Sequence, residues 1–219
     1  MENSSFRFAQ FIHPDRFSGF LEAADQDSHI AERLYIWNIQ VSAAFWGGFH
    51  FLEILLRNAI HAKFIEYAQT EEWWQTDLPI RQAERNAIHE AKVKVFKHQK
   101  FPSPGHVIAE LSLGFWVGLF ANNYHSTLWI GRLESLFPNY SGTRRELHAD
   151  LEILRKLRNR IAHHESIYTR NLTRDFEILC SLIGFMDKDV ADLVRSHSRV
   201  EAIIVGKDDE VSGTSKLSF

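Results

Sequence analysis

Cysteine is almost absent from this chain of 219 residues, which contains only Cys180. A single cysteine cannot form an internal disulfide, so the chain is not a small scaffold held together by cross-links. Cys180 lies in the apolar run 178–183, where a buried core position is expected. This usage predicts a protein of the reducing cytoplasm.

Long hydrophobic runs are also missing. No window of 18 residues is free of charged or polar side chains, and residues 1–10 contain no continuous apolar segment. The sequence therefore predicts neither a membrane span nor a secretory leader.

Several catalytic motifs are absent as well. The chain has no Gly-rich phosphate loop, no G-x-S-x-G elbow, no H-E-x-x-H and no paired cysteines, so NTPase, serine-hydrolase and zinc-enzyme classes lack support. The densest candidate metal-binding cluster is His163, His164 and Glu165 with His148, but adjacent histidines on a helix diverge by about 100°. No metal or other cofactor is expected.

An excess of charge of either sign is missing too: the net charge is −3 and the pI about 6.5. This balance argues against nucleic-acid binding across the whole surface. Positive side chains do gather in one region, at Arg144, Arg145, Arg155, Lys156, Arg158 and Arg160. Although such a run is usually a solvated helix face, it makes Arg155 and Lys156 candidates for a local RNA contact.

What the sequence does contain is helical periodicity, and strand-like alternation is almost absent. The fold class is predicted to be all-α. Helices are expected at 14–24, from about 29 to 67 with Ser28 as cap, and at 80–98, 106–122, 126–137, 143–165 and 173–186. Gly47 and Gly48 predict a kink or a close helix crossing. The expected organisation is an N-terminal helical extension (1–27), a helical domain (28–198) and a partly disordered tail (199–219), disordered above all after Gly206.

The stretch 157–165 combines an Arg and a His five positions apart near the end of the helix expected at 143–165. The apolar face of that helix is formed by Leu147, Leu151, Leu154, Leu157 and Ile161. Arg158 falls at the edge of this face, where a guanidinium is costly without a partner. Asn159 and His163 lie one turn apart beside it, so Arg158, Asn159 and His163 are predicted to border one groove.

A partial echo of this stretch occurs at 56–61. Glu53, Arg57 and His61 stand at successive four-residue steps on one helix face. One interpretation is a buried Glu53–Arg57 ion pair that fixes helix register. The other is that Glu53 or Arg57 faces Arg158 and His163 from the neighbouring helix and orients them.

The string 158–165, RNRIAHHE, resembles the motif of the HEPN superfamily, and within it the Abi-like branch associated with abortive infection and phage resistance. The segments 49–58 and 110–120 are also similar to Abi-like proteins, and the resemblance spans about residues 30–190. Ser166 departs from the Pro that often follows His-His-Glu in the family, which affects a turn rather than the proposed chemistry.

This resemblance implies a HEPN-like helical bundle with additional helices, in which the first long helix packs beside the motif helix. It also implies a homodimeric, metal-independent ribonuclease that leaves 2′,3′-cyclic phosphate and 5′-hydroxyl ends. Arg158 and His163 would be catalytic with Asn159 assisting, and Arg160, His164, Glu53 and Arg57 would be supporting candidates. RNA is the expected substrate, and an antitoxin or regulatory protein is a candidate partner.

The residue types suit that chemistry. RNA cleavage needs a group that takes a proton from the 2′-hydroxyl, a group that protonates the leaving oxygen and a cation for the phosphorane. One chain supplies one motif histidine, so a two-fold dimer that brings together two copies of His163 is the natural arrangement.

Two alternatives remain open. Arg158 can simply pair with Glu53 or Glu165, while His163 and His164 close the helix C-terminus. The domain would then be a noncatalytic module that binds RNA, a nucleotide or a protein.

Overall fold

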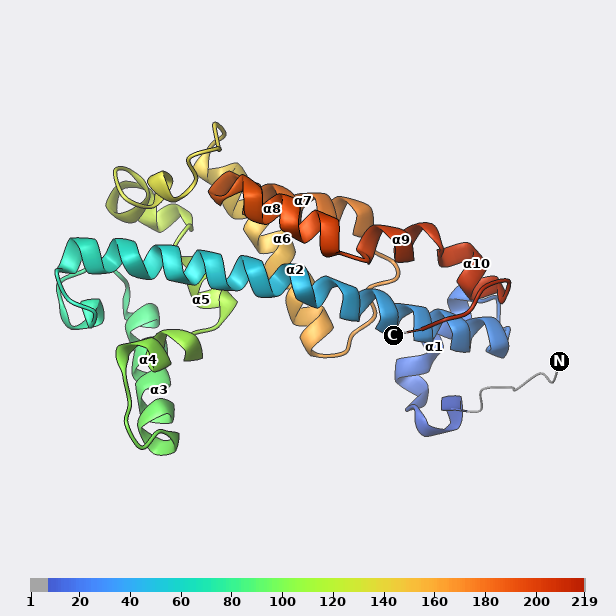
Figure 1. The fold of residues 1–219 in the computed structure, drawn as a ribbon. Coiled ribbons are helices and arrows are strands. Elements are labelled where there is room, and N and C mark those ends of the chain that lie inside the picture. The colour runs from blue at the N-terminus through green and yellow to red at the C-terminus, as the bar shows by residue number, and fades with distance from the viewer. Residues whose placement is uncertain (1–7, 219) are drawn as a thin grey trace.

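The computed structural model describes residues 8–218 and is 74% helical, and this described part contains no strand (Figure 1). The helices are α1 (Pro14–Ala23), α2 (Ser28–Ala68), α3 (Gln82–His98), α4 (Pro104–Glu110), α5 (Leu113–Gly118), α6 (Arg144–Ala162), α7 (Leu172–Met186), α8 (Lys188–His197), α9 (Val200–Val205) and α10 (Lys207–Ser212). Short 3₁₀ or π turns occupy Phe8–Phe11, Trp73–Gln75, Asn122–Tyr124, His125–Trp129 and Leu133–Leu136. The all-α prediction is confirmed.

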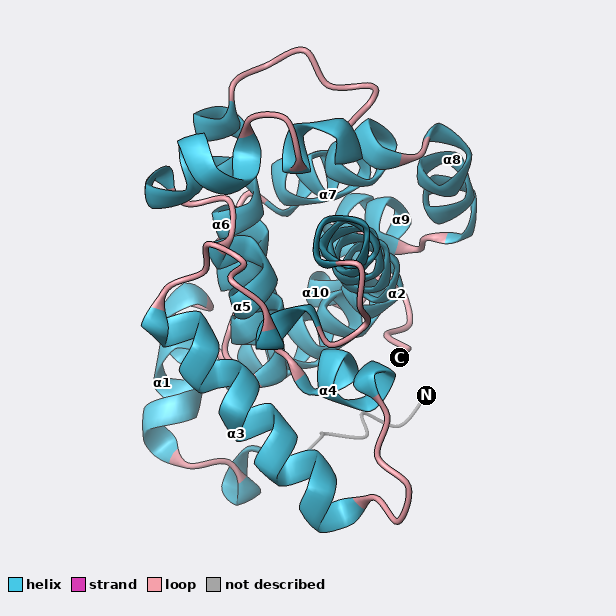
Figure 2. Cartoon of the chain, turned by 90° about the vertical axis from the view of Figure 1, so that its left-hand side faces the viewer, coloured by secondary structure: helices cyan, strands magenta, loops and turns pink. Residues whose placement is uncertain are grey.

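The 41 residues of α2 form the axis of the molecule. Asp27 caps this helix, because its carboxylate accepts hydrogen bonds from the amides of His29 and Ile30 at 2.9 and 3.0 Å. Ser28, expected to be the cap, is instead the first helical residue. Viewed along its axis, α2 lies among α6, α7, α9 and α10 (Figure 2).

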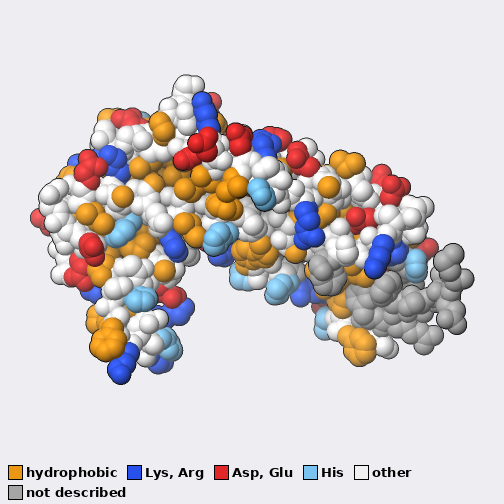
Figure 3. Space-filling view, viewed as in Figure 1, with side chains coloured by type: hydrophobic (Ala, Val, Ile, Leu, Met, Phe, Trp, Pro, Cys, Tyr) orange, Lys and Arg blue, Asp and Glu red, His pale blue; other side chains and the backbone are white. Residues whose placement is uncertain are grey.

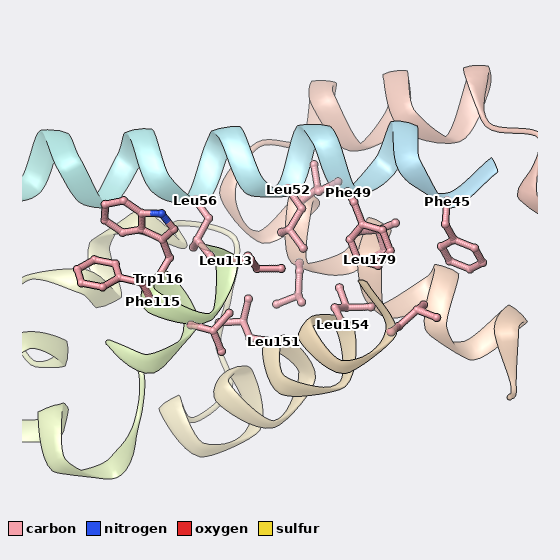
Figure 4. Packing of buried hydrophobic residues seen from close by; sticks show 14 of the residues in the cluster. Phe45, Phe49, Leu52, Leu56, Leu113, Phe115, Trp116, Leu151, Leu154 and Leu179 are labelled. Carbon is pink, nitrogen blue, oxygen red and sulfur yellow. The ribbon is translucent and has the colours of Figure 1, made fainter. Parts of the chain in front are cut away.

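The core follows one face of α2. Phe45, Phe49, Leu52 and Leu56 point toward leucines of α6 and α7 and toward the aromatic side chains of α5 (Figure 4). These four side chains are at most 1% exposed. Their burial removes several hundred Å² of apolar surface from water, at about 25 cal/mol per Å², so the α2–α6 contact that positions the motif is part of the main core.

Gly47 and Gly48 mark a close helix crossing without interrupting α2. A Cβ at Gly48 would lie 2.5 Å from Cδ2 of Leu179 on α7, whereas a Cβ at Gly47 would meet nothing within 4 Å. The predicted close crossing is confirmed for Gly48, because a Cβ at this position would displace the buried Leu179 side chain of α7.

The end of the chain differs from the sequence-based expectation. Residues 207–212, predicted to be disordered, form α10, which packs on α2. Arg33 donates to the carbonyls of Glu210 and Ser215 at 2.6 and 2.7 Å, and the Lys207 ammonium lies 4.9 Å from the ring centre of Trp37. These contacts order a segment whose polar composition alone predicts no packed structure. The proposed domain boundaries stay predictions.

By length and composition alone, α2 would be able to cross a membrane. An 18-residue window within it has a mean hydropathy of 1.3, and 39% of that window is buried. The expectation that the chain has no membrane span stays a prediction. A buried core helix passes the same test, so this feature does not locate the protein.

The single cysteine is where the sequence predicts it. Cys180 is 1% exposed within α7. Burial raises the pKa of its thiol to about 11, which keeps the sulfur protonated at neutral pH.

Candidate functional site at the end of α6

The motif helix is α6. Thr143 and Glu146 form a capping box at its start, in which the Thr143 hydroxyl accepts from the Glu146 amide and the Glu146 carboxylate accepts from the Thr143 amide. The five predicted apolar positions of this helix are at most 3% exposed. The helix crosses α2, and its C-terminal end lies on the same side of α2 as α1 (Figure 1).

Arg158 is held against α2. Its Nε donates to Oε1 of Glu53 at 2.7 Å and its Nη2 lies 3.5 Å from Oε2. Its guanidinium carbon is 5.7 Å from the ring centre of Trp46, which lies two helical turns before Glu53 on α2. The Arg158 and Glu53 side chains are 28% and 26% exposed. The hypothesis that Glu53 faces Arg158 from the neighbouring helix is confirmed, and so is the simpler expectation that Arg158 pairs with an acid.

The echo on α2 forms no ion pair of its own. Glu53 bonds to Arg158 rather than to Arg57, whose Nε lies 3.4 Å from the side-chain oxygen of Asn58. The imidazole of His61 accepts from the indole of Trp73 at 2.9 Å, and burial lowers its pKa. The predicted Glu53–Arg57 pair is therefore wrong, because α6 supplies a better-placed guanidinium.

The end of α6 turns sharply at the two motif histidines. The amide of Glu165 donates to the Arg160 carbonyl at 2.8 Å and the amide of His164 to Ile161 at 3.0 Å, which is a Schellman closure. His164 has φ 57°, a left-handed conformation that glycine usually occupies and that strains other residues. His163 is the last residue before this turn, and its side chain is exposed.

Four hydrogen bonds from two side chains fix the loop that follows. Arg16 of α1 donates through Nη2 to the carbonyls of His163 and His164. The buried Asn38 of α2 accepts from the amides of Ile167 and Tyr168 at 2.7 and 3.2 Å. These contacts satisfy backbone groups that the helix end leaves unpaired, so the position of the motif histidines depends on both α1 and α2.

A groove of about 550 Å³ opens beside this helix end. Its lining comes from α1, α2 and the end of α6, and includes Arg16, Ile39, Trp46, Arg160, His164 and Glu165. Arg158, Asn159 and His163 are not among the lining residues, so the prediction that these three border one groove is wrong within a single chain. The reason is that Arg158 turns toward Glu53, while the chain leaves the helix at His163.

The remaining candidates divide between this groove and the outer face of α6. Arg160 lies 3.3 Å from the carboxylate of Glu165. Arg155 makes two bonds of 2.9 and 2.8 Å to Glu152 on its own helix, which offsets its charge. Lys156 is exposed.

Comparison with protein-family models, curated proteins and solved structures finds no match to this chain.

The structure adds two residues that sequence reasoning missed, Arg16 and Trp46. Arg16 lies about 150 residues before the helix end that it binds, with sequence separations of 147 and 148, and no periodicity links the two. Trp46 belongs to an apolar helix in which most aromatic side chains are core, yet it is 41% exposed. An exposed Trp on such a helix is a signal only once the neighbouring helices are placed.

No described group of three or more His, Cys, Asp or Glu side chains within residues 8–218 could hold a metal ion. His148 and His163 lie on the same helix about 22 Å apart along its axis, at 1.5 Å per residue. In the space-filling view, histidine side chains are spread along the lower side of the molecule, which is hollowed beside the α3–α4 arm (Figure 3).

A second groove, of about 410 Å³, lies between α2 and α8 and is lined mainly by apolar and small side chains such as Phe51 and Leu193. His197 and Arg199 stand at its edge. This groove contains no residue of the motif.

Proposed function

We propose that this protein is a metal-independent endoribonuclease of the Abi-like branch of the HEPN superfamily. Arg158, Asn159 and His163 carry the chemistry, and the working form is a homodimer in the cytoplasm that serves phage defence and is restrained by a regulatory protein. The observation that supports the proposal is that the end of one helix presents a guanidinium held in place, Arg158, and, five residues later, an exposed imidazole, His163.

Arg158 is suited to bind a phosphate. Glu53 occupies Nε and Nη2 of its guanidinium, so Nη1 retains its two donors for a phosphate oxygen. Because Glu53 and Trp46 hold the side chain on two sides, less rotamer entropy is lost when a substrate binds. A fixed cation of this kind stabilises the extra negative charge of a phosphorane.

His163 is suited to proton transfer. Its backbone is fixed by Arg16 and by the bond of its amide to the Asn159 carbonyl at 2.9 Å, while its ring faces solvent. The ring nitrogens of an imidazole can accept a proton from one oxygen and return a proton to another.

The reaction follows from these groups. His163 takes the proton of the 2′-hydroxyl, and the 2′-oxygen attacks the adjacent phosphorus. The bond from phosphorus to the 5′-oxygen breaks, and the second copy of His163 in the dimer protonates that oxygen. The products are a 2′,3′-cyclic phosphate and a 5′-hydroxyl, and Asn159 orients the phosphate.

One observation favours the second candidate function, a binding module without catalysis. The 550 Å³ groove has an aromatic and a cationic lining, but the lining includes neither Arg158 nor His163. A groove of this size and character can hold a nucleotide or a short stretch of single-stranded RNA without cutting it.

Expression toxicity separates the two candidates. We expect induction of the wild-type chain to slow bacterial growth and fragment cellular RNA, and His163→Ala to relieve both effects. His197→Ala is the matched control, because His197 is also an exposed histidine at a helix C-terminus but lies at the other groove. Equal toxicity of the wild type and His163→Ala, or relief by the control as well, would contradict a catalytic motif.

A further inference from the structure

The groove beside α6 places an exposed indole next to the motif arginine. Trp46 lines the groove and is 41% exposed, whereas Phe45 and Phe49 on the same helix are fully buried. Its ring lies 6.5 Å from that of Phe49 in an edge-on arrangement, so the core fixes the orientation of the exposed ring. A large aromatic surface held rigidly in solvent is suited to stack against a flat ligand.

The lining of the groove also contains cationic side chains. Arg16 spends only Nη2 on the carbonyls of His163 and His164, so its Nη1 and Nε remain able to donate to a ligand. Arg160 and His164 line the same groove. The lining also contains two acids, Asp15 and Glu165. Glu165 lies 3.3 Å from Arg160, which offsets part of its charge.

An exposed aromatic ring in the same groove as two guanidinium groups matches the chemistry of a nucleotide in a single strand, with its base on the indole and its phosphate on the cations. The volume of about 550 Å³ is within the range of small-ligand sites. We propose that Trp46 stacks an unpaired base of the RNA next to the nucleotide whose phosphate binds Arg158. This inference rests on the proposed ribonuclease function and names how the substrate is recognised.

The geometry makes Trp46 the link between the groove and the motif. The same ring that lines the groove lies 5.7 Å from the guanidinium carbon of Arg158. A base stacked on the indole therefore places its neighbouring phosphate within reach of Arg158. Because stacking tolerates every base, the substrate class is unpaired RNA rather than one sequence, with a preference for purines.

The test measures binding without cleavage. Three proteins are compared, all with His163→Ala: one with Trp46 intact, one with Trp46→Phe and one with Trp46→Leu. Fluorescence anisotropy measures how each binds a labelled oligoadenylate decamer and a matched decamer with abasic ribose units. We expect Trp46→Leu to bind oligoadenylate about 5- to 150-fold more weakly, Trp46→Phe to retain most binding, and the preference over the abasic decamer to disappear in Trp46→Leu. Phe96→Leu is the control, because Phe96 is also an exposed ring on a helix, 63% exposed on α3, but does not line this groove, so its loss should leave binding unchanged.

Two further outcomes separate this inference from simpler explanations. If Trp46 acts only by holding Arg158, Trp46→Leu will weaken binding no further in an Arg158→Ala background, which would overturn the stacking role. If Trp46 belongs to the contact between protomers, Trp46→Leu will instead lower the dimer fraction measured by sedimentation. This outcome would also overturn the stacking role.

The same measurements separate the stacking role of Trp46 from the proposed ribonuclease function. If the protein with Trp46 intact and the Trp46→Leu variant bind both decamers equally, and the protein with His163 intact cleaves RNA, only the stacking role is rejected. Absence of any RNA binding with Trp46 and Arg158 intact rejects both.

Discussion

The Glu53–Arg158 pair is the contact through which the neighbouring helix reaches the motif, and its removal should change both stability and activity. The Nε–Oε1 distance is 2.7 Å and the two side chains are 28% and 26% exposed. Glu53→Gln keeps the size of the side chain and one hydrogen-bond acceptor but removes the charge. Arg158 then retains its position less firmly and loses its ionic partner.

The magnitude follows from this intermediate burial. At a charge separation of about 4 Å and an effective dielectric of about 20, the attraction is about 4 kcal/mol before desolvation and ordering costs are subtracted. Exposed pairs contribute about 0–1 kcal/mol, whereas breaking a fully buried pair costs about 3–5 kcal/mol. We therefore expect Glu53→Gln to lower the free energy of unfolding by about 1–2 kcal/mol, which shifts Tm by about 2–8 °C for a chain of this size.

The assay is a double-mutant cycle in urea, with Glu53→Gln, Arg158→Gln and the double variant. The coupling free energy should be about 1 kcal/mol, and a value below about 0.3 kcal/mol would refute the reasoning. For cleavage, we expect kcat to fall about tenfold in Glu53→Gln, equivalent to about 1.4 kcal/mol, with little change in KM.

Glu177→Gln is the matched control for this cycle. Glu177 also pairs with an arginine across two helices, through bonds of 2.6 and 3.2 Å to Arg195, but lies away from the motif. This pair is more exposed, so its loss should cost about 0–1 kcal/mol and leave kcat unchanged. A kcat of Glu53→Gln equal to that of Glu177→Gln would show that Glu53 does not position Arg158.

Three further predictions concern stability. Gly48→Ala should be about 1–2 kcal/mol less stable in urea than Gly47→Ala, because only the former drives a Cβ into Leu179, and equal stabilities would contradict the close crossing. His164→Gly should raise the free energy of unfolding by about 1 kcal/mol by relieving the left-handed φ of 57°, and a loss of stability would show that the imidazole makes a compensating contact. His61 has its pKa lowered from 6.5 by burial, so the unfolded chain binds a proton that the folded chain resists. Its contribution to stability is therefore present above pH 6.5 and declines as pH falls below that value. The urea midpoint of His61→Gln should decline less than that of the wild type over this pH range. An identical decline in both proteins would refute this assignment.

The motif helix could be predicted from sequence because it has its own signal. Leucines at three- and four-residue steps defined the buried face of α6, and no glycine or proline interrupts it. The four-residue spacing on the preceding long helix placed Glu53 on a face able to meet Arg158. It did not decide whether Glu53 pairs with Arg57 or with Arg158. Only the packing of α2 against α6 decides this choice.

The groove could not be predicted in the same way. Its walls come from α1, α2 and the loop after α6, and the key contacts of Arg16 and Asn38 join residues at least 129 positions apart. Periodicity indicates which face of a helix is buried but not which other segment packs against that face. The ordered helix at residues 207–212 was not predicted for the same reason. It depends on hydrogen bonds from the distant Arg33, and the local composition gives no sign of them.

Cleavage of RNA in EDTA tests the central claim most directly. Purified wild type, Arg158→Ala and His163→Ala are incubated with a mixed tRNA, rRNA and mRNA pool, and the 3′ ends of the products are assayed for cyclic phosphate. We expect the wild type to cleave and leave 2′,3′-cyclic phosphates, with rates about 100- to 10,000-fold lower in His163→Ala. Cleavage that needs an added divalent metal, or that is equal in all three proteins, would contradict a ribonuclease built on Arg158 and His163.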